Sequence, residues 1–212
     1  MFDMIEIEKR VLLAKNDLTR VRTFLDRNAS KQDSFKRFTL VNVPNSDFTQ
    51  DPENAIDLKI RTSGEEALLT LKKGNWHKDT AREEYEVRFE TSQIAELLNI
   101  LVALGKRFFV AIYVFRSKYR YRDFIITIDT FLLMEANVLE IEIVKQKTGT
   151  THEAETELRD CLSELELSPM DSDQTKAFIA RQNTIAQCQI DFHSVEISKW
   201  CLDWRDFIRC IK

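Results

Sequence analysis

Two short runs in which apolar and charged residues strictly alternate stand far apart in the sequence. The first is Ile5-Glu6-Ile7-Glu8-Lys9-Arg10, and the second is Leu139-Glu140-Ile141-Glu142-Ile143. Successive side chains of an extended strand point to opposite faces, so each run predicts a strand with one apolar and one charged face. The apolar face packs on a core. The charged face either meets solvent or lines a site that needs carboxylates and cations together.

The same alternation marks most of the first 145 residues and predicts about eight strands. Two amphipathic helices interrupt them, and their apolar stripes need the apolar strand faces as partners. Residues 30–35 are predicted to form a loop, and after Gly149 the pattern changes to helix. The other strands are predicted at 36–43, 56–61, 67–73, 81–90, 108–121, 124–130 and 138–145, and the helices at 16–28, 92–106, 152–165, 173–188 and 195–211. The chain is therefore predicted to be an α+β protein.

Length and composition narrow the function classes. The 212 residues fit one domain with an extension, which we predict as a domain at 1–150 and a helical C-terminal region at 151–212 packed on it. A net charge of −4 argues against a general nucleic-acid-binding surface. The four glycines have no spacing that would form a Gly-rich phosphate loop.

Targeting signals and cysteine usage point to the cytoplasm. Residues 1–3 lead directly into the first strand without a signal peptide, and no stretch approaches the ~18 apolar residues of a membrane helix. The four cysteines lack C-x-x-C spacing, so buried free thiols are expected. They are Cys161, Cys188, Cys201 and Cys210.

Mixed charges on the strand faces raise the question of a ligand. An ordinary antiparallel sheet with one face in solvent would show such stripes. If the sheet closed into a barrel, the same charges would line a lumen that is costly to desolvate without a ligand. There Lys and Arg would neutralise phosphate oxygens, and carboxylates would hold Mg²⁺ or Mn²⁺. The mixed faces are Glu6/Glu8/Arg10, Asp57/Lys59/Arg61, Arg82/Glu84/Glu86, and Arg116/Lys118/Arg120 with Asp129.

These motifs, in this order, resemble the CYTH superfamily of triphosphate tunnel metalloenzymes, which includes thiamine triphosphatases, inorganic triphosphatases and class IV adenylate cyclases. The resemblance covers residues 4 to 145. The family's E-x-E-x-K resembles Glu6-Ile7-Glu8-Lys9-Arg10, and its L-R-I-R and L-T-L-K resemble Leu58-Lys59-Ile60-Arg61 and Leu69-Thr70-Leu71-Lys72. Its R-x-E-x-E is met by Arg82, Glu84 and Glu86, and its K-x-R resembles residues 116–120. Its later Asp and its closing E-x-E resemble Asp129 and Glu140/Glu142. The chain departs from the family where Arg10 replaces Lys and where 133–137 replace an L-G-x-F turn.

The resemblance implies a closed antiparallel eight-stranded β-barrel, the triphosphate tunnel, with helices packed outside. It implies a metal-dependent hydrolase acting on tripolyphosphate, thiamine triphosphate or a nucleoside triphosphate, with Glu6, Glu8, Arg10 and Lys72 as catalytic residues. Glu84 and Glu86 would serve the metals or hold tunnel cations. Mg²⁺ or Mn²⁺ would be held by Glu6, Glu8, Asp129, Glu140 and Glu142, and the triphosphate by Arg10, Lys59, Arg61, Lys72, Arg82, Arg116, Lys118 and Arg120.

Two other functions stay open at this stage. A class IV adenylate cyclase needs a base-recognition motif, which is not visible, and Phe2 is present without the His that precedes it in those cyclases. A non-catalytic module would bind polyphosphate through the same face, although a pure anion binder gains nothing from so many carboxylates. The expected partner is a small-molecule triphosphate, with no nucleic acid or membrane, and the chain is expected to be a monomer or homodimer.

Overall fold

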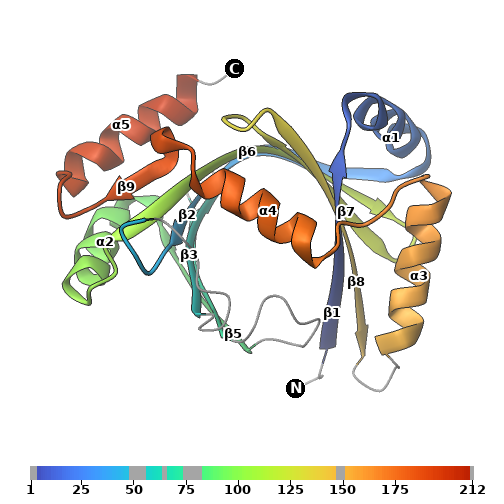
Figure 1. The fold of residues 1–212 in the computed structure, drawn as a ribbon, viewed down its shortest axis with the longest axis horizontal. Helices are drawn as coiled ribbons and strands as arrows, with labels where there is room; N and C mark the ends of the chain where they lie inside the picture. The colour runs from blue at the N-terminus through green and yellow to red at the C-terminus, as the bar shows by residue number, and fades with distance from the viewer. Residues whose placement is uncertain (1–3, 48–55, 64–65, 74–82, 147–150, 211–212) are drawn as a thin grey trace. The chain divides into compact units, whose positions relative to one another are not determined.

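The computed structural model describes residues 4–47, 56–63, 66–73, 83–146 and 151–210, with the backbone alone described at 4–6, 83, 144–146, 151 and 204–210 (Figure 1). The chain divides into two compact units. Unit 1 comprises Met1–Phe35 and Val114–Thr175, and unit 2 comprises Lys36–Tyr113 and Lys176–Lys212. The division predicted from the sequence, into a domain at 1–150 and a helical region at 151–212, stays a prediction.

Strands and helices in the described residues confirm the α+β class. The strands are β1 (Met4–Leu13), β2 (Ser30–Asn42), β3 (Ile56–Ser63), β4 (Glu66–Lys73), β5 (Glu83–Glu90), β6 (Phe108–Tyr121), β7 (Phe124–Phe131), β8 (Ala136–Gln146) and β9 (Gln189–Asp191), and the α-helices are α1 (Lys15–Asn28), α2 (Ile94–Ala103), α3 (Thr151–Glu164), α4 (Ser172–Asn183) and α5 (Ile197–Cys210).

Hydrogen bonds join eight strands in the order β1-β8-β7-β6-β2-β3-β4-β5, and β9 adds to β6. Strands β2 and β6 cross the boundary between the units. Within the part of the chain that the structure describes, β1 and β5 end this order, so the sheet is not closed by hydrogen bonds. The antiparallel sheet is confirmed, while the closed barrel stays a prediction.

In unit 1 the apolar faces of β1, β8, β7 and β6 pack against α1 and α3. Leu139 and Ile141 of β8 are fully buried in this core, together with Leu25 of α1 and Leu158 of α3. Helix α3 runs along β8 and contacts β1 as well (Figure 1). The alternate residues of the same strands therefore form the opposite face, which carries the charges.

Unit 2 repeats this plan with β2, β3, β4 and the first residues of β6. Leu40 and Ile60 are fully buried against Leu98 of α2, and Ile197 of α5 joins the same core. Helices α2 and α5 contact each other (Figure 1). As predicted, α2 ends near Gly105, where φ is +81°. A residue with a Cβ would be strained there even though the site has room for it.

Two sequence predictions of secondary structure are wrong. Residues 30–35 are strand rather than loop, and the Ser34 hydroxyl donates to the Ser117 hydroxyl of β6 at 3.3 Å. Residues 30–34 are polar and mostly exposed, so they carry no alternation that would have predicted a strand. Helix α4 ends at Asn183 rather than 188, because the backbone is already extended at Ile185. The Gln189 side chain donates to the Asn183 carbonyl, and β9 follows.

Cys161, Cys188 and Cys201 are buried free thiols, as predicted, while the side chain of Cys210 lies outside the described residues. Burial raises the pKa of Cys188 to about 11. Burial, followed by the charge of Glu164, raises the pKa of Cys161 to about 11. No helix in the described residues has the length and apolar character needed to cross a bilayer.

Candidate functional site

The charged face of unit 1 is built from residues that lie directly opposite one another on four neighbouring strands. Because opposed residues of antiparallel strands share a face, each cross-strand row presents its side chains together. From β1 through β8 and β7 to β6, the rows are Glu8–Glu142–Ile125–Arg120, Arg10–Glu140–Thr127–Lys118 and Leu12–Val138–Asp129–Arg116.

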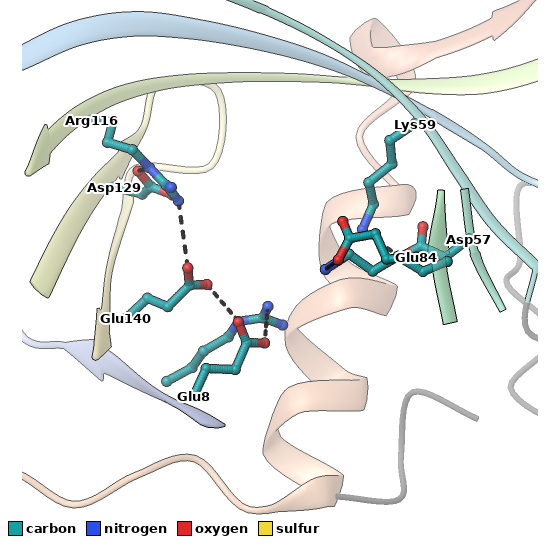
Figure 2. Close-up of polar contacts among 9 residues, drawn as sticks. Glu8, Asp57, Lys59, Glu84, Arg116, Asp129 and Glu140 are labelled. Carbon is teal, nitrogen blue, oxygen red and sulfur yellow. Dashed lines mark hydrogen bonds and ion pairs between the residues drawn. The ribbon is translucent and has the colours of Figure 1, made fainter. Parts of the chain in front are cut away.

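Five side chains of this face form one chain of alternating carboxylates and guanidinium groups (Figure 2). Arg10 donates from Nη2 to Glu8 Oε1 at 2.6 Å and from Nε to Glu140 Oε2 at 3.0 Å. Arg116 lies on the other side of Glu140, with Nη2 3.9 Å from Oε1. Arg116 also donates to both oxygens of Asp129, at 2.6 and 2.5 Å. We call these five residues the unit 1 network.

The buried end of the network is the pair of Arg116 and Asp129, whose side chains are 12% and 9% exposed. Burial by itself would lower the pKa of Arg116. The hydrogen bonds and charge of Asp129, with the charges of Glu140 and Glu142, outweigh that effect and raise the pKa. Arg116 is therefore a permanently charged group held in a fixed orientation by two parallel hydrogen bonds.

The arrangement of the acids fits a hard divalent cation in its donor chemistry. Glu8 lies directly opposite Glu142, and like charges in that position destabilise a sheet unless a cation lies between them. Carboxylate oxygens are the ligands that Mg²⁺ and Mn²⁺ prefer. Among the described side chains, however, no three acidic, histidine or cysteine groups converge on one point. Glu6 faces Val144 one row further along β1, and its side chain lies outside the described residues.

Two cations of unit 1 stand beside the network without joining it. Lys118 is partly buried and Arg120 is exposed, and neither forms an ion pair or hydrogen bond within the described part of the chain. Thr127, between Glu140 and Lys118 in its row, has a buried hydroxyl with no hydrogen-bond partner in that same part. Positive charge and a donor are thus available here for an added anion.

Unit 2 has its own charged face on β3, β4 and β5. Lys59 Nζ lies 2.5 Å from Asp57 Oδ2, and Lys72 Nζ lies 2.8 Å from Glu84 Oε2 (Figure 2). Nε of Arg61 is buried without a hydrogen-bond partner in the described residues. The cross-strand rows are Asp57–Lys72–Glu84, Val41–Lys59–Thr70–Glu86 and Thr39–Arg61–Leu68–Arg88.

The predicted site residues therefore divide into three groups. The unit 1 face gathers Glu8, Arg10, Arg116, Lys118, Arg120, Asp129, Glu140 and Glu142, and the unit 2 face gathers Lys59, Arg61, Lys72, Glu84 and Glu86. Arg82 and the side chain of Glu6 lie outside the described residues. Glu84 forms an ion pair with Lys72, and its predicted role at the site stays a prediction. Sequence reasoning did not select Thr127 or Thr70, because threonine is an ordinary strand residue and nothing in the alternation marks it.

Comparison with known proteins assigns the family. The CYTH domain family matches residues 4–176, so the chain belongs to that family. No curated protein matches the chain.

Solved structures share the fold at low sequence identity. The PH1819 protein of Pyrococcus horikoshii OT3 is 20% identical with a TM-score of 0.60, covering 79% of this chain and 94% of that one. HpAC1 of Hippeastrum, a proposed adenylyl cyclase described as having a dominant triphosphatase activity, is 17% identical with a TM-score of 0.52, covering 78% and 90%. A chain of the Schizosaccharomyces pombe Mediator head module is 12% identical with a TM-score of 0.55, covering 78% and 98%. At these identities the likeness establishes the fold alone.

Proposed function

We propose that this protein is a divalent-metal-dependent triphosphatase whose reaction takes place at the charged face of unit 1. The observation that carries the proposal is the unit 1 network, in which two arginines hold Glu8, Glu140 and Asp129 at fixed positions. Such a network orients its charges before any ligand arrives, and preorganised charge supplies most of the catalysis in phosphoryl transfer.

Each described group has a role in this proposal. Glu8, Glu140 and Glu142, with Glu6, would hold Mg²⁺ or Mn²⁺. Held there, the ion would supply positive charge to offset that of the phosphate oxygens. Lys118 and Arg120, which lack ion pairs in the described residues, would contact phosphate oxygens directly. Asp129 would orient Arg116 toward the same face. Because both of its oxygens accept hydrogen bonds from Arg116, this role is favoured over direct binding of the metal ion.

The cations of unit 2 extend the proposal to substrate binding. Arg61 has a buried donor without a partner in the described residues, and Lys59 and Lys72 are each held by a carboxylate. We expect these three to contact a polyphosphate chain.

Phosphate release tests the proposal. The purified protein is incubated with tripolyphosphate, thiamine triphosphate or ATP, with Mg²⁺ or Mn²⁺ and with EDTA as the control. Metal-dependent release from at least one substrate is expected. Cyclic AMP formed from ATP would instead favour the cyclase. No release from any substrate, together with tight binding of tripolyphosphate, would favour a non-catalytic module and overturn the hydrolase.

A further inference from the structure

The Thr127 hydroxyl is a buried polar group that the fold leaves unsatisfied. The residue is 4% exposed, and Oγ1 has no hydrogen-bond partner in the described part of the chain. A buried hydroxyl without a partner opposes folding, and a valine of the same shape would fill the position at lower cost. A threonine at this place therefore calls for an explanation outside stability.

The position of Thr127 in the sheet shows which atoms surround that hydroxyl. Thr127 of β7 lies directly opposite Glu140 of β8 and Lys118 of β6, so the three side chains share one face. Directly opposed residues have Cβ atoms about 4.5–5.5 Å apart. Both oxygens of Glu140 already interact with arginines, through Arg10 and Arg116. The Thr127 hydroxyl forms no hydrogen bond with this carboxylate within the described residues.

The groups left over in this row are both hydrogen-bond donors. Lys118 is an ammonium group with three N–H bonds and no ion pair in the described residues, and the Thr127 hydroxyl supplies an O–H. Two neighbouring donors without an acceptor between them suit an added oxygen atom that accepts from both. Thr70 of unit 2 also has a buried hydroxyl without a partner in the described chain, but its neighbour Lys59 is already paired with Asp57.

We propose that Thr127 is a ligand-binding residue whose hydroxyl donates to an acceptor oxygen held between it and Lys118. This inference rests on the proposed function, because that oxygen belongs to the triphosphate or to a water on its metal ion. Thr127 thereby gives the face a neutral donor among its charged groups. A neutral donor fixes the orientation of a phosphate oxygen without adding net charge.

Thr130 provides a matched control on the same strand. Its hydroxyl lies on the opposite face of β7, donates to Asn137 Oδ1 at 2.9 Å and accepts from Arg22 Nη2 at 3.2 Å. Thr127→Val and Thr130→Val are the same chemical change. They should have opposite effects, because one removes a hydroxyl without a partner and the other removes a hydroxyl with two.

The experiment measures binding and stability of the full chain as wild type, T127V, T127S and T130V. Calorimetric titration uses tripolyphosphate in EDTA for one arm and Mn²⁺ alone for the other. T127V should weaken binding about tenfold in one arm, with T127S close to wild type, because a hydrogen bond to a charged oxygen contributes about that factor. Loss in the tripolyphosphate arm identifies a phosphate oxygen, and loss in the Mn²⁺ arm identifies a metal-bound water.

Melting temperatures separate a binding role from a structural one. T127V should melt at or above the wild-type temperature, whereas T130V should melt about 2–4 °C lower and bind as wild type does. Wild-type binding by T127V in both arms overturns the inference, and so does a loss of stability like that of T130V. If the wild-type protein binds neither tripolyphosphate nor Mn²⁺, both the proposed function and this inference are overturned. If only T127V fails to show the expected loss of binding, the inference alone is overturned.

Discussion

The charged faces of the two units differ in how their ions are joined. In the unit 1 network each of the two arginines contacts two carboxylates, Arg10 with Glu8 and Glu140, and Arg116 with Asp129 and Glu140. On the charged face of unit 2, Lys59 pairs with Asp57 and Lys72 pairs with Glu84. A planar guanidinium group offers several donors in a fixed fork, whereas a lysine ammonium is a point charge on a flexible stem.

The two charged faces therefore suit different tasks. A face whose carboxylates share arginines is held rigidly, and disturbing one member disturbs the others. A face built from separate lysine pairs adapts more easily to an arriving anion. We therefore expect chemistry to depend on unit 1 and substrate binding to draw on unit 2. Three experiments test that contrast, and a fourth compares the cores beneath the two faces.

The largest expected effect is on turnover. Glu140→Gln keeps the shape of the side chain but removes the charge that both arginines share, and Glu8→Gln removes a carboxylate opposite Glu142. Each should lower kcat about 10²–10³-fold, the loss seen when one preorganised electrostatic group is removed. The matched change in unit 2, Glu84→Gln, should cost less than about fivefold, because its pair with Lys72 is partly exposed.

Steady-state phosphate release with Mg²⁺ measures these losses, and circular dichroism checks that each variant is folded. Equal losses in Glu140→Gln and Glu84→Gln would break the contrast between the faces. Near-normal rates in both Glu140→Gln and Glu8→Gln would remove those two acids from the metal site.

The next effect is on stability. Arg116→Met removes two hydrogen bonds from Asp129, whose side chain is 9% exposed, and should lower the free energy of unfolding by about 3–5 kcal/mol. Lys59→Met in unit 2 should cost about 1–3 kcal/mol, because the hydrogen bond that the ammonium group donates to Asp57 is lost.

Urea unfolding at pH 7 compares the two variants. Adding Asp129→Asn to Arg116→Met should recover part of the loss, since the second change removes the buried charge that the first leaves with fewer donors. A larger loss in Lys59→Met than in Arg116→Met would reverse the assignment of the rigid face.

Alkaline pH should weaken both units to a similar degree. The pKa values of Cys161 in unit 1 and Cys188 in unit 2 are each raised from about 9 to about 11. Between these values the unfolded chain loses the thiol proton and the folded chain keeps it. Stability is therefore complete below about pH 9 and falls by about 1.4 kcal/mol per pH unit for each thiol up to about pH 11.

Urea unfolding from pH 8 to 11 measures this slope. Cys161→Ala and Cys188→Ala should each reduce it by about half of the thiol contribution, whatever their effect at pH 8. A change for only one of them would show that the two cores differ in how they exclude charge. Slopes equal to wild type in both variants would contradict the link to the thiols.

Much of this architecture was predictable because period-two alternation records which face of a strand is buried. Val11, Leu139 and Ile141 lie in the core, and their neighbours Arg10 and Glu140 lie on the charged face, as the pattern indicates. The pattern failed at residues 30–35, where residues that are polar except for Phe35 form a mostly exposed stretch of strand. Local patterns carry no signal for such a strand.

The sequence predicts which residues lie on the charged face but not which of them contact one another. Strand periodicity places Arg116 and Asp129 on the charged face of the sheet. Only the register between β6 and β7 shows that the two residues lie directly opposite each other. Long-range register also places Thr127 between Glu140 and Lys118. Sequence spacing within one strand says nothing about the residue opposite, so partners across strands had to come from the structure.

The smallest expected effect concerns phosphate contacts. Lys118 has no ion pair in the described residues, whereas Lys72 is paired with Glu84. Lys118→Met should raise the KM for tripolyphosphate about fivefold, and Lys72→Ala about twofold, because a paired lysine has less charge to offer and a partly exposed contact contributes about 1 kcal/mol or less. Steady-state rates at several salt concentrations measure both, since the loss of a phosphate contact also weakens the dependence on salt. An unchanged kcat/KM in Lys118→Met would remove that lysine from the phosphate site. A larger effect in Lys72→Ala than in Lys118→Met would mean that the paired lysine of unit 2 makes the stronger contact with phosphate.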